Sequence, residues 1–449
     1  MQICEDIQSI KEKFAEAGIP LNDGGTRPTK NIVWRFLRLY RAVSDPRCQG
    51  MVLYPLPEIL LIAFLAVLAD ADNWVEIEQF GLSNERWLKK FLRLKNGIPS
   101  HDTFRRVFGI IDTSEFQDAT VCVLVQNIAS IKRTLGVDGG GIRFLCVDGK
   151  EERGTGRKYS VYAESKVRNL QTLHIYDRTN GVCVFSKGID SKTNEIPVAQ
   201  KALGLMDLKN VIVTADAMHA QKGFTGIVKQ KGGDYVVGLK GNQSALRDDV
   251  GLYFDEQTRN RIRSRKKNFY DVEEKNHSQY ERRRYYLAPA ARIPDARRDE
   301  EWAGLKAFVC YEKFIMDTQG NKTRETRFYI ASVTDVRLCA DAIRGHWKVE
   351  SMHWSLDTVF HEDDNSTMDR KAFDNIGLLK KMCNSLMTVM QPLMGKNVSK
   401  KVMRKRFGWN YTEMLSKLLF CIDPDAIERA LRDVEAGKKA RKRRTQQLG

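Results

Sequence analysis

The stretch Ile142-Arg-Phe-Leu-Cys-Val-Asp-Gly-Lys150 decides the fold class, because it contains an apolar run of strand length that ends in an aspartate. A second run of the same kind, Asn210 to Thr214, is followed by Ala215-Asp216. Short apolar runs bounded by turn residues are typical of buried strands. The sequence therefore predicts two buried strands, each with an aspartate at its carboxyl end.

The segments around these two runs predict the rest of a mixed sheet. Residues 170–176 and 182–187 flank Asn180-Gly181, a dipeptide typical of a two-residue hairpin turn. Further along, the pattern predicts two helices and a strand, at 195–206, 220–231 and 235–239. Three antiparallel strands followed by helix, strand, helix and strand indicate an α/β fold with a mixed sheet.

The rest of the chain is predicted to be helical at both ends and β-rich before a long helix at 339–360. Residues 54–128 have a helical pattern, in which Ser100 is expected to cap a helix over 101–110. Arg105 and Arg106 on that helix fit a DNA-reading helix-turn-helix or an ordinary helical hairpin. We expect this helical segment to fold and bind DNA without the sheet. The predicted divisions are an N-terminal extension at 1–48, a helical DNA-binding part at 49–135, a catalytic part at 140–245 and 333–395, a β-rich insertion at 246–332 and a basic helical region at 396–449.

Positive charge is concentrated in the second half of the chain. The 449 residues carry a formal net charge of +17, and 42% of them are hydrophobic. A pI near 9.4 suits a polyanionic partner. Each basic run alone is compatible with a solvated surface, but together the runs favour nucleic acid over an anionic membrane, because none lies on an amphipathic apolar face. The runs are RSRKK at 263–267, RRR at 282–284, KKVMRKR at 400–406 and KKARKRR at 438–444.

Targeting signals and cysteine usage predict a cytosolic protein, associated with the nucleoid through DNA. The longest apolar run, 59–69, is too short to span a bilayer, and the N-terminus lacks the apolar region of a secretory signal. The nine cysteines lie far apart, form no C-x-x-C pair and are odd in number. They predict reduced thiols and neither a disulfide framework nor a zinc knuckle.

Asp148 and Asp216 are the first candidates for a catalytic site, because catalytic groups in α/β sheets gather at the carboxyl ends of strands. A lone strand-end aspartate usually caps a turn, but two on strands of one small sheet are expected to converge. Converging carboxylates repel each other unless a cation neutralises them, and ligation by oxygen alone favours Mg²⁺ or Mn²⁺ over zinc. Glu350 is the third candidate. Helical spacing places it between Trp347 and Trp354 on a largely apolar stripe, where an unpartnered carboxylate is costly.

Two other metal sites would use the same helix. Glu350-x-x-His353 and Glu274-x-x-His277 have the spacing of di-iron carboxylate bundles, although the second lies in a charged segment without an apolar face. His346, Glu350 and His353 are compatible with zinc on one helix face, although no H-E-x-x-H motif occurs. The sequence also lacks a Walker A loop, a G-x-S-x-G motif and a G-x-G-x-x-G after a strand, which disfavours nucleotide hydrolases, serine esterases and Rossmann enzymes.

Six motifs in order between about residues 45 and 390 carry a resemblance to a known family. They are DPRCQGMVLYPLPEILLIAFLAVLADADNWVEIEQFG, NGIPSHDTFRRVFGIID, VDGKEERG, SKTNEIPVAQKALGLMDLKNVIVTADAMHAQKG, DYVVGLKGNQ and RGHWKVESMHWSLDTVFHEDD. With them the chain resembles the bacterial insertion-sequence transposases of the H-repeat-associated type, which belong to the DDE group with a ribonuclease-H-like fold. No motif of the family is recognised in residues 1 to about 44 or in the tail from about 430.

The resemblance implies a catalytic triad and a reaction. Asp148, Asp216 and Glu350 would be the DDE residues and would bind two Mg²⁺ or Mn²⁺ ions. The enzyme would cut double-stranded DNA at the terminal inverted repeats of its element and transfer the 3′ ends to target DNA, as a homodimer on paired ends. Neither a nucleotide cofactor nor a covalent protein intermediate is expected.

The helix of Glu350 departs from the pattern of related transposases. They often carry Y-x-x-R-x-x-x-E there, with a lysine seven residues after the glutamate. The corresponding residues here are Ile343, His346 and Asp357, so no phosphate contact is assigned to them. Trp347 and Trp354 are expected either to pack in the core or to stack on a displaced base. Phosphate contacts are instead expected from basic residues beside the motifs, which are Lys150, Lys240, Arg344 and Lys348.

Two other functions stay open at this point. One is a divalent-metal DNA nuclease that never joins strands. The other is a DNA-binding protein of a mobile element whose catalytic site has decayed. The presence of Asp148, Asp216 and Glu350 favours an active enzyme over the second alternative.

Overall fold

The computed structural model describes residues 40–121, 141–155, 169–189, 195–276, 279–293, 302–365, 367, 369–394, 398–411, 413–414 and 418. The Gly-rich stretch 136–140, His277, the basic run 438–444 and most of the predicted N-terminal extension lie outside these residues.

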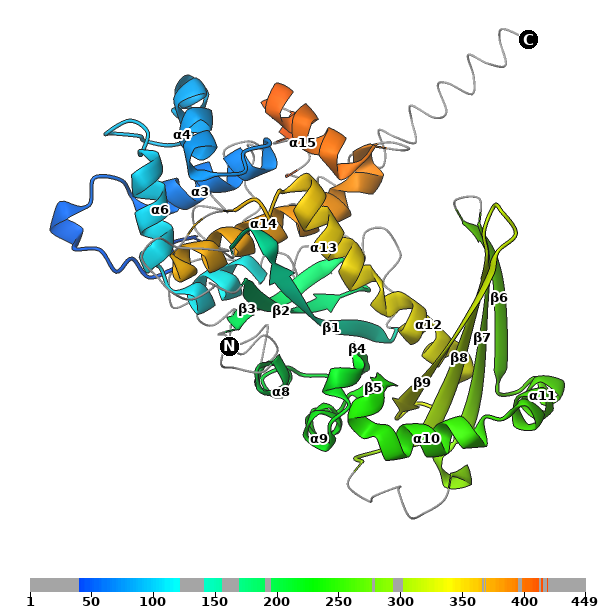
Figure 1. Ribbon diagram of the computed structural model, residues 1–449. Helices are drawn as coiled ribbons and strands as arrows, with labels where there is room; N and C mark the ends of the chain where they lie inside the picture. Colours follow the sequence, from blue (N-terminus) through cyan, green and yellow to red (C-terminus); the bar gives the residue numbers. More distant parts are fainter. Residues whose placement is uncertain are drawn as a thin grey trace, which may run out of the picture.

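A mixed sheet of nine strands forms the centre of the molecule, in the order β3-β2-β1-β4-β5-β9-β8-β7-β6 (Figure 1). The strands are β1 Arg143–Glu152, β2 Leu170–Asp177, β3 Val182–Ile189, β4 Val211–Ala215, β5 Asp234–Leu239, β6 Phe269–Asn276, β7 Gln279–Pro289, β8 Ala307–Met316 and β9 Lys322–Ala331. β1, β4 and β5 are parallel, whereas the other neighbours pair antiparallel. The predicted mixed α/β fold is confirmed, including the hairpin in which Gly181 adopts a positive φ of 74°.

β1 is longer than the sequence pattern predicts. Its parallel pairing with β4 stops at Val147 and Ala215, but its antiparallel pairing with β2 continues to Glu152. The prediction that Asp148 ends its strand is therefore wrong, since β2 supplies backbone partners for the next four residues. Asp148 nevertheless lies where the parallel ladder ends.

The β-rich segment is an extension of the same sheet. Strands β6 to β9 form an antiparallel meander, as expected, but β9 pairs with β5 and so continues the central sheet without interruption. The meander projects from the rest of the molecule (Figure 1). Two helices precede it, α10 at Ser244–Tyr253, which begins two residues before the predicted insertion, and α11 at Glu256–Arg265.

Helices cover both faces of the sheet. α8 and α9 lie on one face, and α12, α13 and α14 lie on the other (Figure 1). The helices outside the insertion are α3 Leu56–Leu68, α4 Trp74–Ser83, α5 Glu85–Leu88, α6 His101–Ile110, α8 Glu195–Gly204, α9 Lys222–Gln230, α12 Val336–His346, α13 Lys348–Val359, α14 Arg370–Met390 and α15 Lys400–Trp409. The predicted cap is confirmed, because the Ser100 side chain accepts a hydrogen bond from the backbone N–H of Thr103.

The N-terminal helices share a core with the C-terminal ones. α3 and α6 pack against α14, and the Asn375 side chain of α14 donates to the backbone carbonyl of Phe108, 2.7 Å away. Arg404 of α15 is fully buried and donates to the carbonyls of Val67 and Ala71. The N-terminal helices without α14 and α15 would expose this core, so the expectation that they fold alone is not supported.

The helix predicted at 339–360 is two helices that meet at Trp347. The buried face of α13 contains Val349, Met352 and Leu356, which are spaced at helical intervals. Trp347 and Trp354 lie on the other side and are 39% and 66% exposed. The predicted apolar stripe around Glu350 is therefore wrong, and so is the alternative that both tryptophans pack in the core.

Two further observations concern apolar helices and cysteines. Within the part of the chain that is described, no helix is long and apolar enough to cross a membrane. Among the described cysteines all six thiols are free, and only Cys48 is exposed.

Candidate active site

The three predicted acids come from three elements that meet at the end of the parallel ladder. Asp148 lies in β1, Asp216 directly follows β4, and Glu350 lies in the first turn of α13. Val147 and Ala215 are paired, so the aspartates that follow them lie side by side on neighbouring strands. The charges of Asp216 and Glu350 both raise the pKa of Asp148. The structure thus brings all three predicted acids together.

Asp148 is the acid that this arrangement perturbs most. Its pKa is raised to about 7, first by burial and then by the repulsion of Asp216 and Glu350, while His346 opposes the shift. An aspartate normally titrates near 4, so the site disfavours the ionised form of Asp148. A further positive charge at this point would stabilise its carboxylate.

Two histidines lie against the two aspartates. His346 Nε2 is 3.7 Å from an oxygen of Asp216, and His353 Nδ1 is 3.7 Å from an oxygen of Asp148. Burial opposes the ionisation of His346, but the nearby Asp216 carboxylate, Cys146 and Asp148 outweigh burial and raise its pKa to about 10. The site therefore favours the protonated form of His346, beside Asp216.

His353 is held in the neutral form. Its pKa falls to about 4, first because of burial and then because of the positive charge of Lys150. Its Nε2 lies 2.9 Å from Nδ1 of the buried His174 on β2. His353 thus lies between Asp148 and the buried His174.

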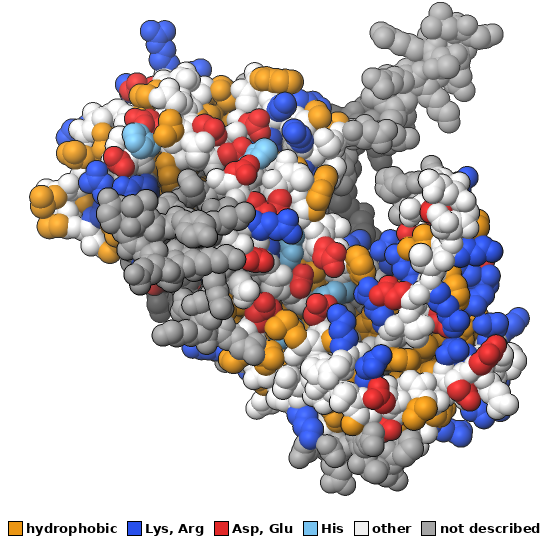
Figure 2. Space-filling model, in the orientation of Figure 1, with side chains coloured by type: hydrophobic (Ala, Val, Ile, Leu, Met, Phe, Trp, Pro, Cys, Tyr) orange, Lys and Arg blue, Asp and Glu red, His pale blue; other side chains and the backbone are white. Residues whose placement is uncertain are grey.

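A pocket of about 270 Å³ opens beside Asp216 and Glu350. Its wall includes Lys240, Arg247 and Arg327. The Trp347 ring contributes to the same wall and lies 5.5 Å from the Arg327 guanidinium. Figure 2 shows acidic side chains and histidines in the middle of this face, next to the Lys- and Arg-rich surface of the β6–β9 meander. The pocket is thus lined by acidic residues at its centre and by basic residues at its rim. This arrangement suits a phosphodiester backbone that lies beside carboxylates.

The basic residues that were predicted to contact DNA lie in different parts of the molecule. Lys240 is exposed in the pocket wall, and Lys348 is exposed at the start of α13. Arg344 is exposed but lies 4.0 Å from Glu274 of β6. Arg105 and Arg106 are exposed on α6, at the helical end of the molecule, and Arg105 pairs with Asp102.

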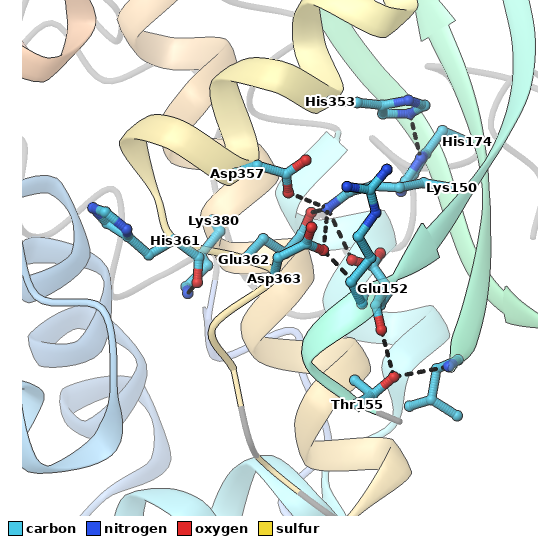
Figure 3. Close-up of polar contacts among 12 residues, drawn as sticks. Lys150, Glu152, Thr155, His174, His353, Asp357, His361, Glu362, Asp363 and Lys380 are labelled. Atoms are coloured by element: carbon cyan, nitrogen blue, oxygen red, sulfur yellow. Dashed lines mark hydrogen bonds and ion pairs between the residues drawn. The ribbon is translucent and has the colours of Figure 1, made fainter. Parts of the chain in front are cut away.

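Lys150 occupies a structural position. Its side chain is 6% exposed, and its ammonium lies 2.8 Å from carboxylate oxygens of both Glu152 and Glu362 and 2.6 Å from Asp357 (Figure 3). These carboxylates outweigh the effect of burial and raise its pKa. Lys150 is therefore bound inside the protein and is not placed to contact a phosphate, in contrast to the sequence prediction.

The cluster around Lys150 was not predicted from the sequence. Glu362 also accepts a hydrogen bond from Lys381 of α14 at 2.6 Å, so one buried carboxylate accepts hydrogen bonds from two ammonium groups. The acidic run 362–364 was the only local sign of it. The residues of this cluster come from β1, α13, α14 and the loop between α13 and α14. These segments are too far apart in the sequence for a local pattern to reveal their contact.

Two of the four basic runs are largely used within the fold. Arg282 pairs with Asp271 and Glu273, and Arg283 pairs with Glu274 and Glu281. In the run 400–406, Arg404 is buried and Arg406 pairs with Glu413. The prediction of a free basic surface therefore fails for these arginines, because acids on adjacent elements neutralise them.

The acids have the donor chemistry that Mg²⁺ or Mn²⁺ requires, but they are not gathered around one point. Among the described residues, no three His, Cys, Asp or Glu side chains are placed to hold a metal ion as they stand. The charges of Asp216 and Glu350 nevertheless act on Asp148, and this repulsion is the penalty that a divalent cation relieves. The residues fit such an ion if their side chains turn away from His346 and His353.

The alternative metal sites do not form in the described residues. Glu274 lies in a strand and pairs with Arg283, so the di-iron bundle interpretation is wrong. His346 and His353 face different aspartates and do not meet at one face of a helix, as a zinc site would require.

Comparison with known proteins gives matches along most of the chain. Residues 139–384 match the family model described as Transposase DDE domain, and residues 37–122 match the model described as DDE_Tnp_1-associated. "Putative transposase YncI" of Escherichia coli O157:H7 is 32% identical over 369 residues, which cover 80% of this chain and 89% of that protein. "H repeat-associated putative transposase YhhI" of Escherichia coli K12 is 30% identical over 332 residues, 72% of this chain and 82% of that protein. A solved piggyBac transposase in a synaptic complex with hairpin DNA aligns with a TM-score of 0.35 and 10% identity, over 93% of this chain and 82% of that chain.

Proposed function

The chain belongs to the family of transposases with a DDE domain, as its H-repeat-associated motifs predict, and on this premise we propose that it cuts DNA at the ends of a mobile element and joins the 3′ ends to target DNA. The convergence of Asp148, Asp216 and Glu350 carries the proposal, since the acids meet at the end of the parallel ladder and repel one another. We also infer that strands β1 to β5 and their helices form a ribonuclease-H-like catalytic part.

The site residues have separate roles in this proposal. Asp148, Asp216 and Glu350 would hold two Mg²⁺ or Mn²⁺ ions, which when bound activate the attacking oxygen and stabilise the leaving oxygen of a phosphodiester. Lys240 and Arg327 in the pocket wall bind the phosphates on either side of the reacting one. A homodimer on paired element ends and a location on the chromosome follow from the same proposal.

The test is a strand-transfer assay with the full-length protein. Sequencing the DNA that flanks the gene identifies the inverted repeats, and these supply intact and pre-cut end fragments. We expect cleavage of intact ends and joining of pre-cut ends to a plasmid in Mg²⁺. Cleavage without joining would favour the metal-dependent nuclease, and repeat binding without either reaction would favour a decayed protein.

Divalent metal is expected to stabilise the protein as well as to support cleavage. An ion that binds only the folded state at about 100 times its Kd adds about 2.7 kcal/mol to the free energy of unfolding. We expect Mg²⁺ or Mn²⁺ to raise the melting temperature and excess chelator to abolish cleavage. Full cleavage in chelator would contradict the metal-dependent mechanism.

Repeat recognition is expected to depend on α6. Arg105 and Arg106 are exposed there, and each specific base contact contributes about 1 to 3 kcal/mol. Replacing both with alanine in the full-length chain should erase the preference for repeat DNA over random DNA in a binding titration. Neutralising the run 438–444 should instead weaken binding to both DNAs equally, because phosphate contacts carry no sequence information. A double variant that keeps its preference would exclude α6 as the reading helix.

A further inference from the structure

Glu195 brings a fourth carboxyl group to the acids of the site. It is the first residue of α8, on the face of the sheet opposite α13. Its carboxyl group lies directly over Gly149, the residue after Asp148. A Cβ at position 149 would collide with the carboxyl carbon and both oxygens. Because Gly149 has no side chain, the Glu195 carboxyl group can occupy this space beside the backbone of β1, one residue from Asp148.

The charge of Glu195 acts on the predicted acids. It contributes to the raised pKa of Asp148, and its own pKa is raised, first by burial and then by Asp216. Glu195 therefore lies within electrostatic range of two members of the triad. A third negative charge near Asp148 increases the repulsion that an added cation would relieve.

The partner of Glu195 in the described residues is His219, which cannot neutralise it. Nε2 of His219 lies 3.9 Å from the Glu195 carboxylate, beyond hydrogen-bond distance. Burial lowers the pKa of His219 to about 4, so the ring is neutral at pH 7. The ring is completely buried, and neither of its nitrogens has a hydrogen-bond partner among the described residues.

Such an arrangement is costly unless another group enters it. Among the described residues, the buried imidazole has no hydrogen-bond partner and the carboxylate lies beside no cation, so each loses interactions that it would have in water. Both groups lie within electrostatic range of Asp216, and Glu195 also acts on Asp148. A divalent cation with its bound water would satisfy both, since the cation attracts the carboxylate and the water can bond to the imidazole.

We propose that Glu195 is a fourth carboxylate ligand for the divalent cation of this site, admitted by Gly149, and that the buried His219 forms a hydrogen bond with water bound by that cation. The inference rests on the proposed function, because it places Glu195 beside the same ion. Asp148, Asp216 and Glu350 alone do not account for the position of Glu195, whose carboxyl group occupies the space of a side chain at position 149.

The experiment compares Mn²⁺ binding by the full-length wild-type protein and by Glu195→Gln, using calorimetric titration and the melting temperature with and without Mn²⁺. Loss of a metal-supporting group typically weakens metal affinity by about 10- to 100-fold. We expect the Mn²⁺ Kd of Glu195→Gln to rise by at least about tenfold and its Mn²⁺-induced gain in melting temperature to shrink. Its melting temperature in chelator should match or exceed that of the wild type, because a repelling charge is removed.

Two further variants make the result specific. Gly149→Ala pushes the Glu195 carboxyl group away while leaving the glutamate in place, and it should weaken Mn²⁺ binding in the same way. Glu151→Gln removes an exposed carboxylate from the same strand and should bind Mn²⁺ like the wild type.

The outcomes separate this inference from the proposed function. If the wild type binds Mn²⁺ and cleaves DNA while Glu195→Gln binds Mn²⁺ equally well, the role of Glu195 is overturned and the proposed function stands. A lower melting temperature of Glu195→Gln in chelator, with unchanged Mn²⁺ affinity, would make Glu195 a structural residue. A wild type that binds no Mn²⁺ would overturn both.

Discussion

Asp216→Asn is expected to lower the DNA cleavage rate by at least about a hundredfold while binding to element-end DNA stays near the wild-type level. The substitution keeps the shape of the side chain but removes a charge that both a divalent cation and the His346 imidazolium require. The exposed basic residues of α6 and of the pocket wall are unchanged, so the protein should still bind the repeat. Single-turnover cleavage and a binding titration on the same DNA measure the two effects.

Asp207→Asn is the matched control at the other end of β4. Asp207 is exposed and accepts a hydrogen bond from the backbone N–H of Lys209, which is the role of an aspartate that only caps a turn. We expect this control to cleave at the wild-type rate. If Asp216→Asn also cleaved at nearly that rate, Asp216 would be a second capping residue and the triad assignment would have to be withdrawn.

Local patterns in the sequence predicted the elements that depend on neighbouring residues. The hairpin at Asn180-Gly181 and the cap at Ser100 are decided by a few adjacent residues, and both are confirmed. The convergence of Asp148 and Asp216 was also predictable, because parallel strands of one sheet end on the same side.

Contacts between distant segments were not predictable in this way. β1 continues beyond Asp148 because β2 pairs with it, and Arg283 pairs with Glu274 on the neighbouring strand β6. A basic run in a sequence shows the charges of one segment but not those of the segment beside it. Glu195 was missed for the same reason, since only the folded sheet places it over Gly149.

The break between α12 and α13 shows a different limit. The sequence pattern over 339–360 fits one continuous helix, and on such a helix Trp347 and Trp354 flank Glu350 on one face. The structure buries Val349 and Met352 instead, which turns Glu350 and both tryptophans outward. The predicted stripe is therefore wrong, and Glu350 as a metal ligand stays a prediction.

Glu362→Gln is expected to have the largest effect on stability. Glu362 is 1% exposed and accepts hydrogen bonds from Lys150 at 2.8 Å and Lys381 at 2.6 Å. Burial opposes the ionisation of Glu362, but Lys381 and Lys150 outweigh it and hold its pKa below the usual range. Removing one partner of a buried ion pair typically costs about 3 to 5 kcal/mol, because the remaining charge stays buried without compensation.

Urea unfolding of Glu362→Gln and of a surface control tests this expectation. Glu325→Gln removes one partner of the exposed pair with Arg327 and should change the free energy of unfolding by no more than about 1 kcal/mol. A similarly small change for Glu362→Gln would mean that the remaining acids compensate Lys150 and Lys381. Lys150 lies in β1, two residues after Asp148. The loss of Glu362 should therefore also loosen the strand that carries the proposed catalytic aspartate. Cleavage by the variant should then fall most steeply with rising temperature, whereas Asp216→Asn should be inactive at every temperature.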